Sequence, residues 1–143
     1  EEFVIGGSKT LRSSDSDVAT VVGAGITLRE ALKAYGELKK EGINIRVIDL
    51  YSVSPIDAAT LEKAARDTKV IITVEDYYGA GGIGEAVASV IEDLRSKIED
   101  LRTNLIRLSV KKMPRSGKPE ELLGYEEIDA EAIVKVVREL LNK

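Results

Sequence analysis

Short apolar runs alternate along the chain with longer stretches whose apolar residues recur every three to four positions. The runs are rich in β-branched residues and are typical of strands buried on both faces of a sheet. The longer stretches are typical of helices with one apolar face. The expected strands span residues 18–22, 43–48, 70–74 and 105–110 with an edge strand over 9–13, and the expected helices span 28–41, 55–66, 83–102 and 130–141 with a helical turn over 120–123.

This alternation predicts parallel strands joined by helical crossovers, with helices on both faces of the sheet. We therefore predict an α/β fold with three layers, α/β/α, around a mostly parallel five-stranded sheet with one antiparallel edge strand. The length of 143 residues is typical of one domain, which we place at residues 9–143. Residues 1–8 show little pattern, and we expect a linker remnant or a mobile tail there.

Polar residues and glycines suggest where the helices begin and end. Thr27 precedes Glu30 by three residues, which is the spacing of a capping box at a helix start. Gly42 lies where a left-handed cap would end that helix. Ser54 is expected to cap the next helix, with Pro55 at its first position, where a missing N–H has no cost.

The composition narrows the chemistry open to this chain. It contains no cysteine and no histidine, which excludes disulfides, thiolate metal sites and Ser-His or Cys-His catalysis within the chain. The net charge of −4 gives no general attraction to nucleic acid or to an anionic membrane. No apolar run approaches the roughly 20 residues of a membrane span. We expect no nucleic-acid or membrane partner and a cytoplasmic location.

Two glycine-rich segments follow expected strands and precede expected helices. The first, residues 23–28, resembles a dinucleotide-binding turn, with Asp49 placed as a ribose ligand would be. Leu28 stands where the third glycine is required, so a tight turn is the favoured interpretation. The second, residues 79–85, could hold an anion at a helix N-terminus, or it could be a close-packed contact loop, and Glu85 could itself satisfy the helix dipole.

Charged residues gather in two further places. Glu75 and Asp76 end a strand at the edge where parallel sheets bind ligands, although helix capping is the commoner use of such acids. The segment 107–118 is basic and could contact phosphate or form an exposed or interfacial loop. The candidate anion or interface residues in these loops are Gly81, Gly82, Gly84, Glu85, Arg115, Ser116 and Lys118, and we assign no catalytic, cofactor or metal residue.

Three segments together resemble the C-terminal domain of transketolases. The first comprises residues 21–32 with residues 42–50 and 55–57, and the second is the glycine-rich signature over residues 74–78 and 81–87. The third segment, from Pro114 to Leu123, contains Pro-Arg-Ser-Gly-Lys-Pro and is the most specific of the three, because it points to transketolases rather than to pyruvate-dehydrogenase-type relatives, which share the first two. The resemblance extends from about Glu2 to Leu141.

The resemblance implies a function for the larger enzyme rather than for this chain alone. Transketolases, enzymes of the pentose phosphate pathway, move a two-carbon ketol unit between sugar phosphates, using thiamine diphosphate and Mg²⁺ held by two other domains. This domain would help to build the dimer and would bind those other domains or a separate subunit. No catalytic residue of the family falls on this chain, so we expect it to be inactive alone. It would be either a domain of a longer polypeptide or a subunit of a split enzyme.

The chain departs from the family pattern at two places. Many relatives have His where this chain has Tyr77, and the stretch from Arg95 to Thr103 looks longer and more helical than its counterpart. Two alternative functions remain. One is a small-anion or regulatory ligand-binding module, and the other, a nicotinamide enzyme, would need a glycine at position 28.

Overall fold

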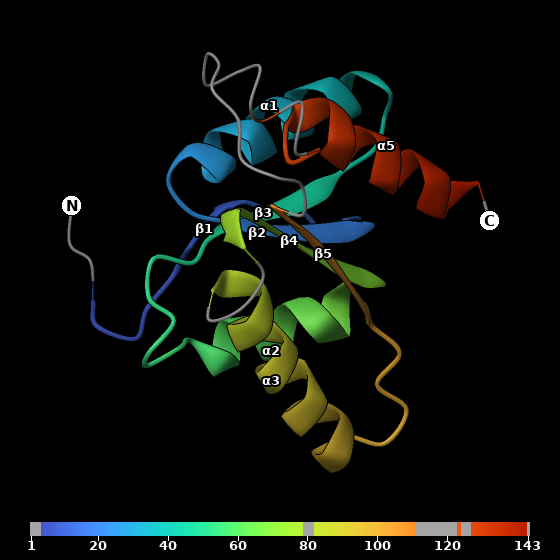
Figure 1. Cartoon of the computed structure of the whole chain (residues 1–143). Coiled ribbons are helices and arrows are strands. Elements are labelled where there is room, and N and C mark those ends of the chain that lie inside the picture. Colours follow the sequence, from blue (N-terminus) through green and yellow to red (C-terminus); the bar gives the residue numbers. More distant parts are fainter. Residues whose placement is uncertain (1–3, 79–81, 111–122, 124–126, 143) are drawn as a thin grey trace.

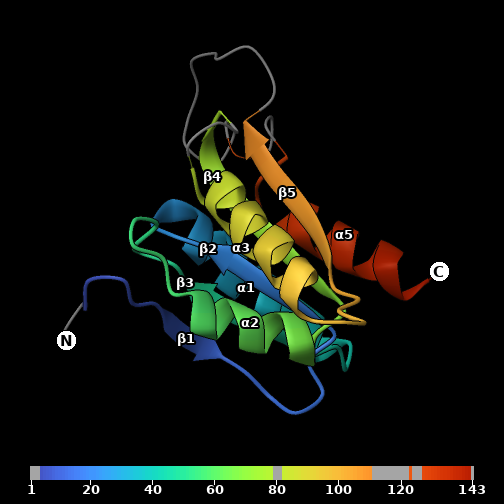
Figure 2. The same cartoon turned by 90° about the horizontal axis from the view of Figure 1, so that it is seen from below.

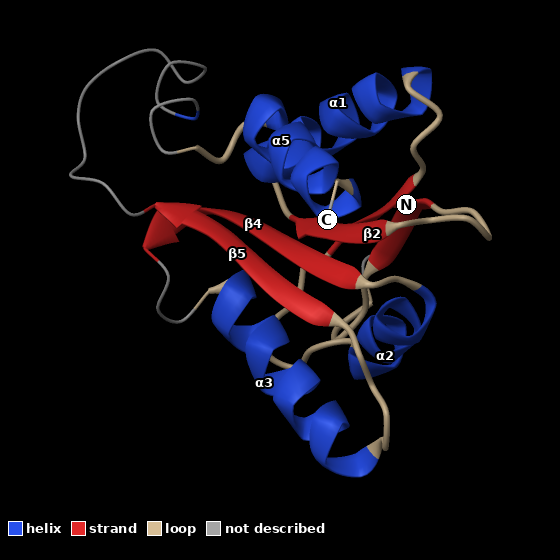
Figure 3. Cartoon of the chain, turned by 90° about the vertical axis from the view of Figure 1, so that its right-hand side faces the viewer, coloured by secondary structure: helices blue, strands red, loops and turns tan. Residues whose placement is uncertain are grey.

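A computed structural model describes residues 4–78, 82–110, 123 and 127–142. One five-stranded sheet lies between two layers of helices (Figures 1 and 3), in the strand order β1-β3-β2-β4-β5. All neighbouring strands run parallel except β1 and β3, which are antiparallel, so the predicted fold class is confirmed. The strands are β1 (Lys9–Arg12), β2 (Ala19–Gly23), β3 (Ile45–Asp49), β4 (Val70–Tyr78) and β5 (Asn104–Val110), and the helices are α1 (Ile26–Lys40), α2 (Ala58–Asp67), α3 (Ile83–Lys97) and α5 (Ala130–Leu141).

The two helical layers bury different sets of apolar side chains. Helices α1 and α5 cover one face of the sheet, and α2 and α3 cover the other (Figure 1). All five residues of β2 are buried, because this strand lies at the centre of the sheet and is covered on both faces. The edge strand β1 projects beyond α2 when the molecule is viewed from the α2–α3 side (Figure 2).

Helix α5 packs its apolar stripe against α1 and the sheet. Ile133 and Val137 are fully buried in the core shared with α1, whereas Leu141 at the end of the helix is 46% exposed. Most of the apolar surface of the last helix therefore faces the sheet. None of the helices within the described residues is long and apolar enough to cross a membrane.

The end of α1 confirms the predicted glycine cap. Gly42 has a positive φ of 76°, its N–H donates to the carbonyl of Lys39, and the N–H of Ile43 donates to that of Leu38. This pair of bonds is a Schellman motif, which satisfies carbonyls that the helix leaves free.

The predicted N-terminal caps of the first two helices were wrong. Thr27 lies inside α1, where its hydroxyl bonds the backbone of Ala24, and Glu30 bonds the N–H of Ala130 at the start of α5. The second helix begins only at Ala58, with Asp57 as its cap. Ser54 and Pro55 lie in the preceding turn, closed by the bridge between Val53 and Ile56.

The third helix is shorter than its apolar pattern predicted. It ends at Lys97, and Asp100 has a positive φ of 65° that interrupts helical geometry. Ile98 and Leu101 still pack against the core beneath α2 and α3, although they belong to a loop. An apolar repeat can therefore continue past a helix end when the returning chain stays on the core. The predicted helical turn at 120–123 lies almost wholly outside the described residues.

Candidate functional site

The best-defined polar cluster lies where β4 ends and α3 begins. Gly82 is the N-cap residue of α3 and, as glycine, offers no side-chain oxygen to the free N–H groups of the first turn. The carboxylate of Glu75 takes that role from the neighbouring strand, because its Oε2 accepts a hydrogen bond of 2.6 Å from the Gly84 N–H. A negative charge at a helix N-terminus is also favoured by the helix dipole. The structural interpretation of this acid is therefore confirmed.

The same contact explains the glycine at position 84. A Cβ atom there would collide with Oε2 of Glu75 and with Nε of Arg107. Arg107 lies on β5 directly beside Thr73 of β4, so strand, helix and guanidinium meet at one point. Close approach of the three groups requires a residue without a side chain.

Glu75 is deeply buried for an acidic residue. It is 1% exposed, Thr73 is fully buried, and neither Glu75 Oε1 nor Thr73 Oγ1 has a hydrogen-bond partner in the described part of the chain. Burial raises the pKa of Glu75 above its ordinary value, opposed by the Gly84 N–H and by Arg107 and reinforced by Asp76 and Glu85. The carboxyl thus holds a proton at higher pH than an ordinary glutamate, but its burial suits positioning α3 rather than meeting a substrate.

The structure brings some of the sequence-predicted residues together. Gly82, Gly84 and Glu85 all lie in the first turn of α3 or at its cap, next to Glu75. An anion at the Gly84 N–H would have to displace the carboxylate of Glu75. Arg107 belongs to β5 and contributes to the field at Glu75 rather than to an exposed basic loop. The predicted residues that lie outside the described part of the chain are Gly81, Arg115, Ser116 and Lys118.

The first glycine-rich segment forms a tight turn between β2 and α1. Gly25 has a φ of 60°, a left-handed conformation that glycine adopts without steric cost. At Gly23 a Cβ atom would lie 3.0 Å from the hydroxyl of Thr27, so the turn closes tightly on the strand. The conformation of Gly25 and the close contact at Gly23 confirm a structural use for both glycines.

The acidic side chains of the described residues do not gather into a metal centre. Within them, no three His, Cys, Asp or Glu side chains are grouped so that they could hold a metal ion. At Glu75, the carboxylate oxygen Oε2 is engaged with the start of α3. We therefore derive no catalytic step through thiamine diphosphate or Mg²⁺ from this part of the chain.

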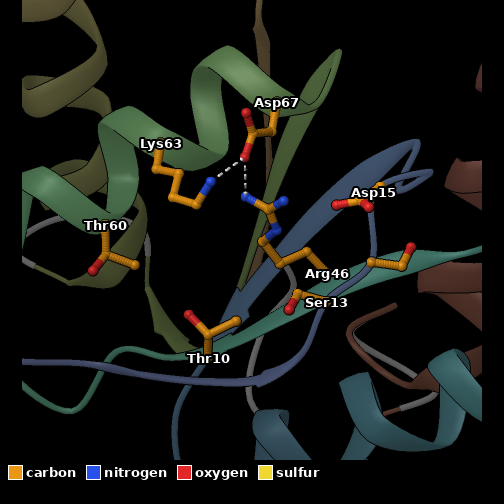
Figure 4. Close-up of a pocket in the computed structure, with 8 residues that line it drawn as sticks. Thr10, Ser13, Asp15, Arg46, Thr60, Lys63 and Asp67 are labelled. Atoms are coloured by element: carbon orange, nitrogen blue, oxygen red, sulfur yellow. Dashed lines mark hydrogen bonds and ion pairs between the residues drawn. The ribbon is translucent and has the colours of Figure 1, made fainter.

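A second polar cluster, which our sequence analysis did not single out, lies between β1 and α2 (Figure 4). It surrounds a cavity of about 760 Å³. Arg46 of β3 is at its centre, 3.1 Å from Asp67 at the end of α2 and 3.4 Å from the buried Asp17. In the sequence this cluster is marked only by an arginine among the apolar residues of β3, which by itself indicates no partner.

Comparison with known proteins identifies the kind of domain to which these features belong. The fold is a three-layer α/β domain, and the family described as "Transketolase, C-terminal domain" matches residues 8–133. The chain therefore belongs to the transketolase family, as its C-terminal domain. Human transketolase is 46% identical over 144 residues, and mouse transketolase-like protein 2 is 48% identical over the same length. Each alignment covers 100% of this chain but only 22% of the relative.

Solved structures share the fold. A protein named "Split gene transketolase, inactive beta4 tetramer" superposes with a TM-score of 0.82 at 30% identity, over 99% of this chain and 43% of that chain. Transketolase from Campylobacter jejuni superposes with a TM-score of 0.68 over 96% of this chain and 19% of that chain. At 15% identity the latter bears on the fold alone.

Proposed function

We propose that this chain is a structural and assembly part of a transketolase that transfers a two-carbon ketol unit between sugar phosphates. The observation that carries the proposal is the family match over residues 8–133. Relatives named as transketolases that align over the whole chain support it. Because the chain spans 22% of the human relative, the proposal concerns its share in a larger catalytic unit.

In this proposal the chemistry takes place outside the chain. Thiamine diphosphate and Mg²⁺ would be held by the other domains or by a partner subunit, and this chain would support them without contributing a catalytic residue. We also propose that the chain contributes homodimer contacts and that the enzyme acts in the cytoplasm, in the pentose phosphate pathway. The internal use of Glu75, whose carboxylate holds the start of α3, is consistent with a supporting role.

The proposal is tested by ketol-transfer activity with thiamine diphosphate and Mg²⁺. The assay compares this chain alone, a chain carrying the other two domains from the same source, and the two mixed. A covalent fusion of the two chains is the fourth sample, so that a need for continuity is separated from a lack of function.

We expect activity in the mixture or in the fusion and none in this chain alone. Activity of the lone chain would overturn the supporting role. Equal activity of the two-domain chain with and without this chain would show that the domain contributes nothing to the reaction. Calorimetry adds a second criterion, since micromolar binding of thiamine diphosphate to this chain alone would also contradict the proposal.

A further inference from the structure

The cavity between β1 and α2 has the composition of a site for a small polar molecule. We propose that it binds a small anion that also carries hydroxyl groups, such as the phosphate ester of a short polyol. Its volume of about 760 Å³ lies within the range of small-ligand sites. The inference does not depend on the proposed function, because it rests on the residues that line the cavity.

The cavity exists because β1 is an edge strand. Helices α2 and α3 cover the rest of this face of the sheet, but β1 projects beyond α2 (Figure 2). The faces of α/β sheets are normally covered by helices. Here polar side chains from β1, β3 and α2 line the uncovered strip, so a hydrophilic ligand fits it better than an apolar segment does.

Arg46 supplies a preorganised cationic centre. Its side chain is only 8% exposed, and it is held by Asp17 through Nε and by Asp67 through Nη1. In Figure 4 the guanidinium lies between α2 and the loop that carries Asp15. Since its contacts to described residues engage Nε and Nη1, Nη2 is the nitrogen able to meet a ligand. A fixed guanidinium is well suited to oxyanions because its donors are planar and always charged.

Lys63 supplies a second cation that can change partner. Its Nζ lies 2.9 Å from the Asp67 oxygen that also contacts Arg46, so two cations share one carboxylate oxygen. Lys63 and Arg46 lower the pKa of Asp67 for that reason. The lysine side chain is 74% exposed, and exposed pairs of this kind contribute little stability. It can therefore turn to an incoming anion without disturbing the core.

The hydroxyl requirement follows from the other lining groups. Thr10 and Ser13 line the cavity, and their hydroxyls form no hydrogen bond to another of the described residues. Asp15 lines it as well and accepts hydrogen bonds only. This carboxylate opposes a bare anion but can accept hydrogen bonds from ligand hydroxyls. The lining therefore favours a molecule with an anionic end near Arg46 and Lys63 and hydroxyls near Asp15.

The experiment follows amide NMR signals of the 143-residue chain during titration. The ligands are glycerol phosphate, inorganic phosphate and glycerol, each against sodium chloride at the same ionic strength. The variants are Lys63→Met and Thr10→Val, and Lys97→Met is the matched control. Lys97 also forms an i,i+4 pair with an aspartate, in the reverse order along the helix, at 3.0 Å from Asp93 on α3 and away from the cavity. Arg46 is not substituted, because that would leave the buried Asp17 without its cationic partner.

We expect glycerol phosphate to shift the signals of Thr10, Ser13 and Lys63 saturably and to bind more tightly than inorganic phosphate. Lys63→Met should weaken binding about tenfold, the order of one lost charge-assisted hydrogen bond, Thr10→Val should weaken it less, and Lys97→Met should leave it unchanged. Equal binding of inorganic phosphate would overturn the hydroxyl requirement. Shifts that sodium chloride reproduces, or that Lys63→Met and Lys97→Met affect alike, would overturn the site.

Discussion

Glu75 is the residue whose protonation should be felt most clearly in the stability of the domain. Its pKa is raised in the folded state, mainly by burial. The folded protein therefore binds this proton more tightly than the unfolded chain does, and the stability that the proton contributes is lost as pH rises through the folded pKa. The ordinary pKa of a glutamate is 4.5. We expect thermal unfolding to show that the stability of Glu75→Gln increases relative to that of the natural chain as pH rises above this value.

The difference in stability between Glu75→Gln and the natural chain cancels the titration of all other groups, since both proteins contain them. Glu92→Gln, on the exposed side of α3, makes the same chemical change outside the core and serves as the control. A constant difference between Glu75→Gln and the natural chain across this range would mean that the Glu75 pKa is not raised.

Two glycines should respond to alanine in opposite directions. Gly84→Ala places a methyl group against Glu75 and Arg107, and such overpacking costs about 1–3 kcal/mol of unfolding free energy. Gly36 lies within α1 with open space at its Cβ position, so Gly36→Ala should stabilise by about 0.5–1 kcal/mol. Urea unfolding measures both, and a stable Gly84→Ala protein would show that Glu75 and Arg107 can move aside.

At the scale of elements, Glu30 joins two helices that are far apart in the sequence. Its carboxylate accepts a hydrogen bond of 3.1 Å from the Ala130 N–H at the start of α5, and the residue is 7% exposed. Glu30→Ala should cost about 1–3 kcal/mol because it leaves a buried N–H without its acceptor. Glu30→Gln keeps an acceptor and should recover part of that loss in the same urea measurement. Equal losses in the two variants would contradict this role for the carboxylate.

Helix α5 is held to the sheet by its apolar stripe. Val137 is fully buried, so Val137→Asp should destabilise by about 3 kcal/mol or more through an unpaired buried charge. Leu141→Asp on the same helix is the control, since Leu141 is 46% exposed and should tolerate the change. A similar melting temperature for Val137→Asp and the natural chain would place this face of α5 in solvent.

The elements themselves could be predicted from the sequence, but several of their partners could not. Local periodicity in the sequence indicates buried strands and amphipathic helices. Gly42 likewise ends α1 through hydrogen bonds to residues only a few positions away. Glu30 has a capping-box spacing, yet its hydrogen bond is made to Ala130, one hundred positions along the chain. A local pattern therefore predicted the wrong partner, because a buried carboxylate bonds whichever N–H the tertiary fold brings to it.

The polar cluster at Glu75 could be predicted from local sequence, whereas the cluster beside β1 could not. The acids and glycines between residues 75 and 85 lie close together in the sequence, so their association at the start of α3 was predictable. The cavity beside β1 combines Thr10, Arg46 and Lys63 from three separate elements. Its existence depends on the order of the strands, which places β1 beside β3 at an edge left uncovered by α2. No short segment of the sequence carries that information.

At the scale of the whole molecule, one sheet separates two apolar cores. Ile133 is fully buried between the sheet and the α1–α5 layer, and Leu61 is fully buried beneath the α2–α3 layer. Because both cores use opposite faces of the same strands, we expect a single cooperative unfolding transition, as is usual for domains of this size. Each of Ile133→Ala and Leu61→Ala should cost about 2–5 kcal/mol.

The double variant tests whether the sheet couples the two layers. The two sites have no shared side-chain core, so their costs should add to within about 0.5 kcal/mol while the transition stays single. Circular dichroism and urea titration read both quantities in one experiment. Two separate transitions would show that one helical layer can detach while the other keeps the sheet folded.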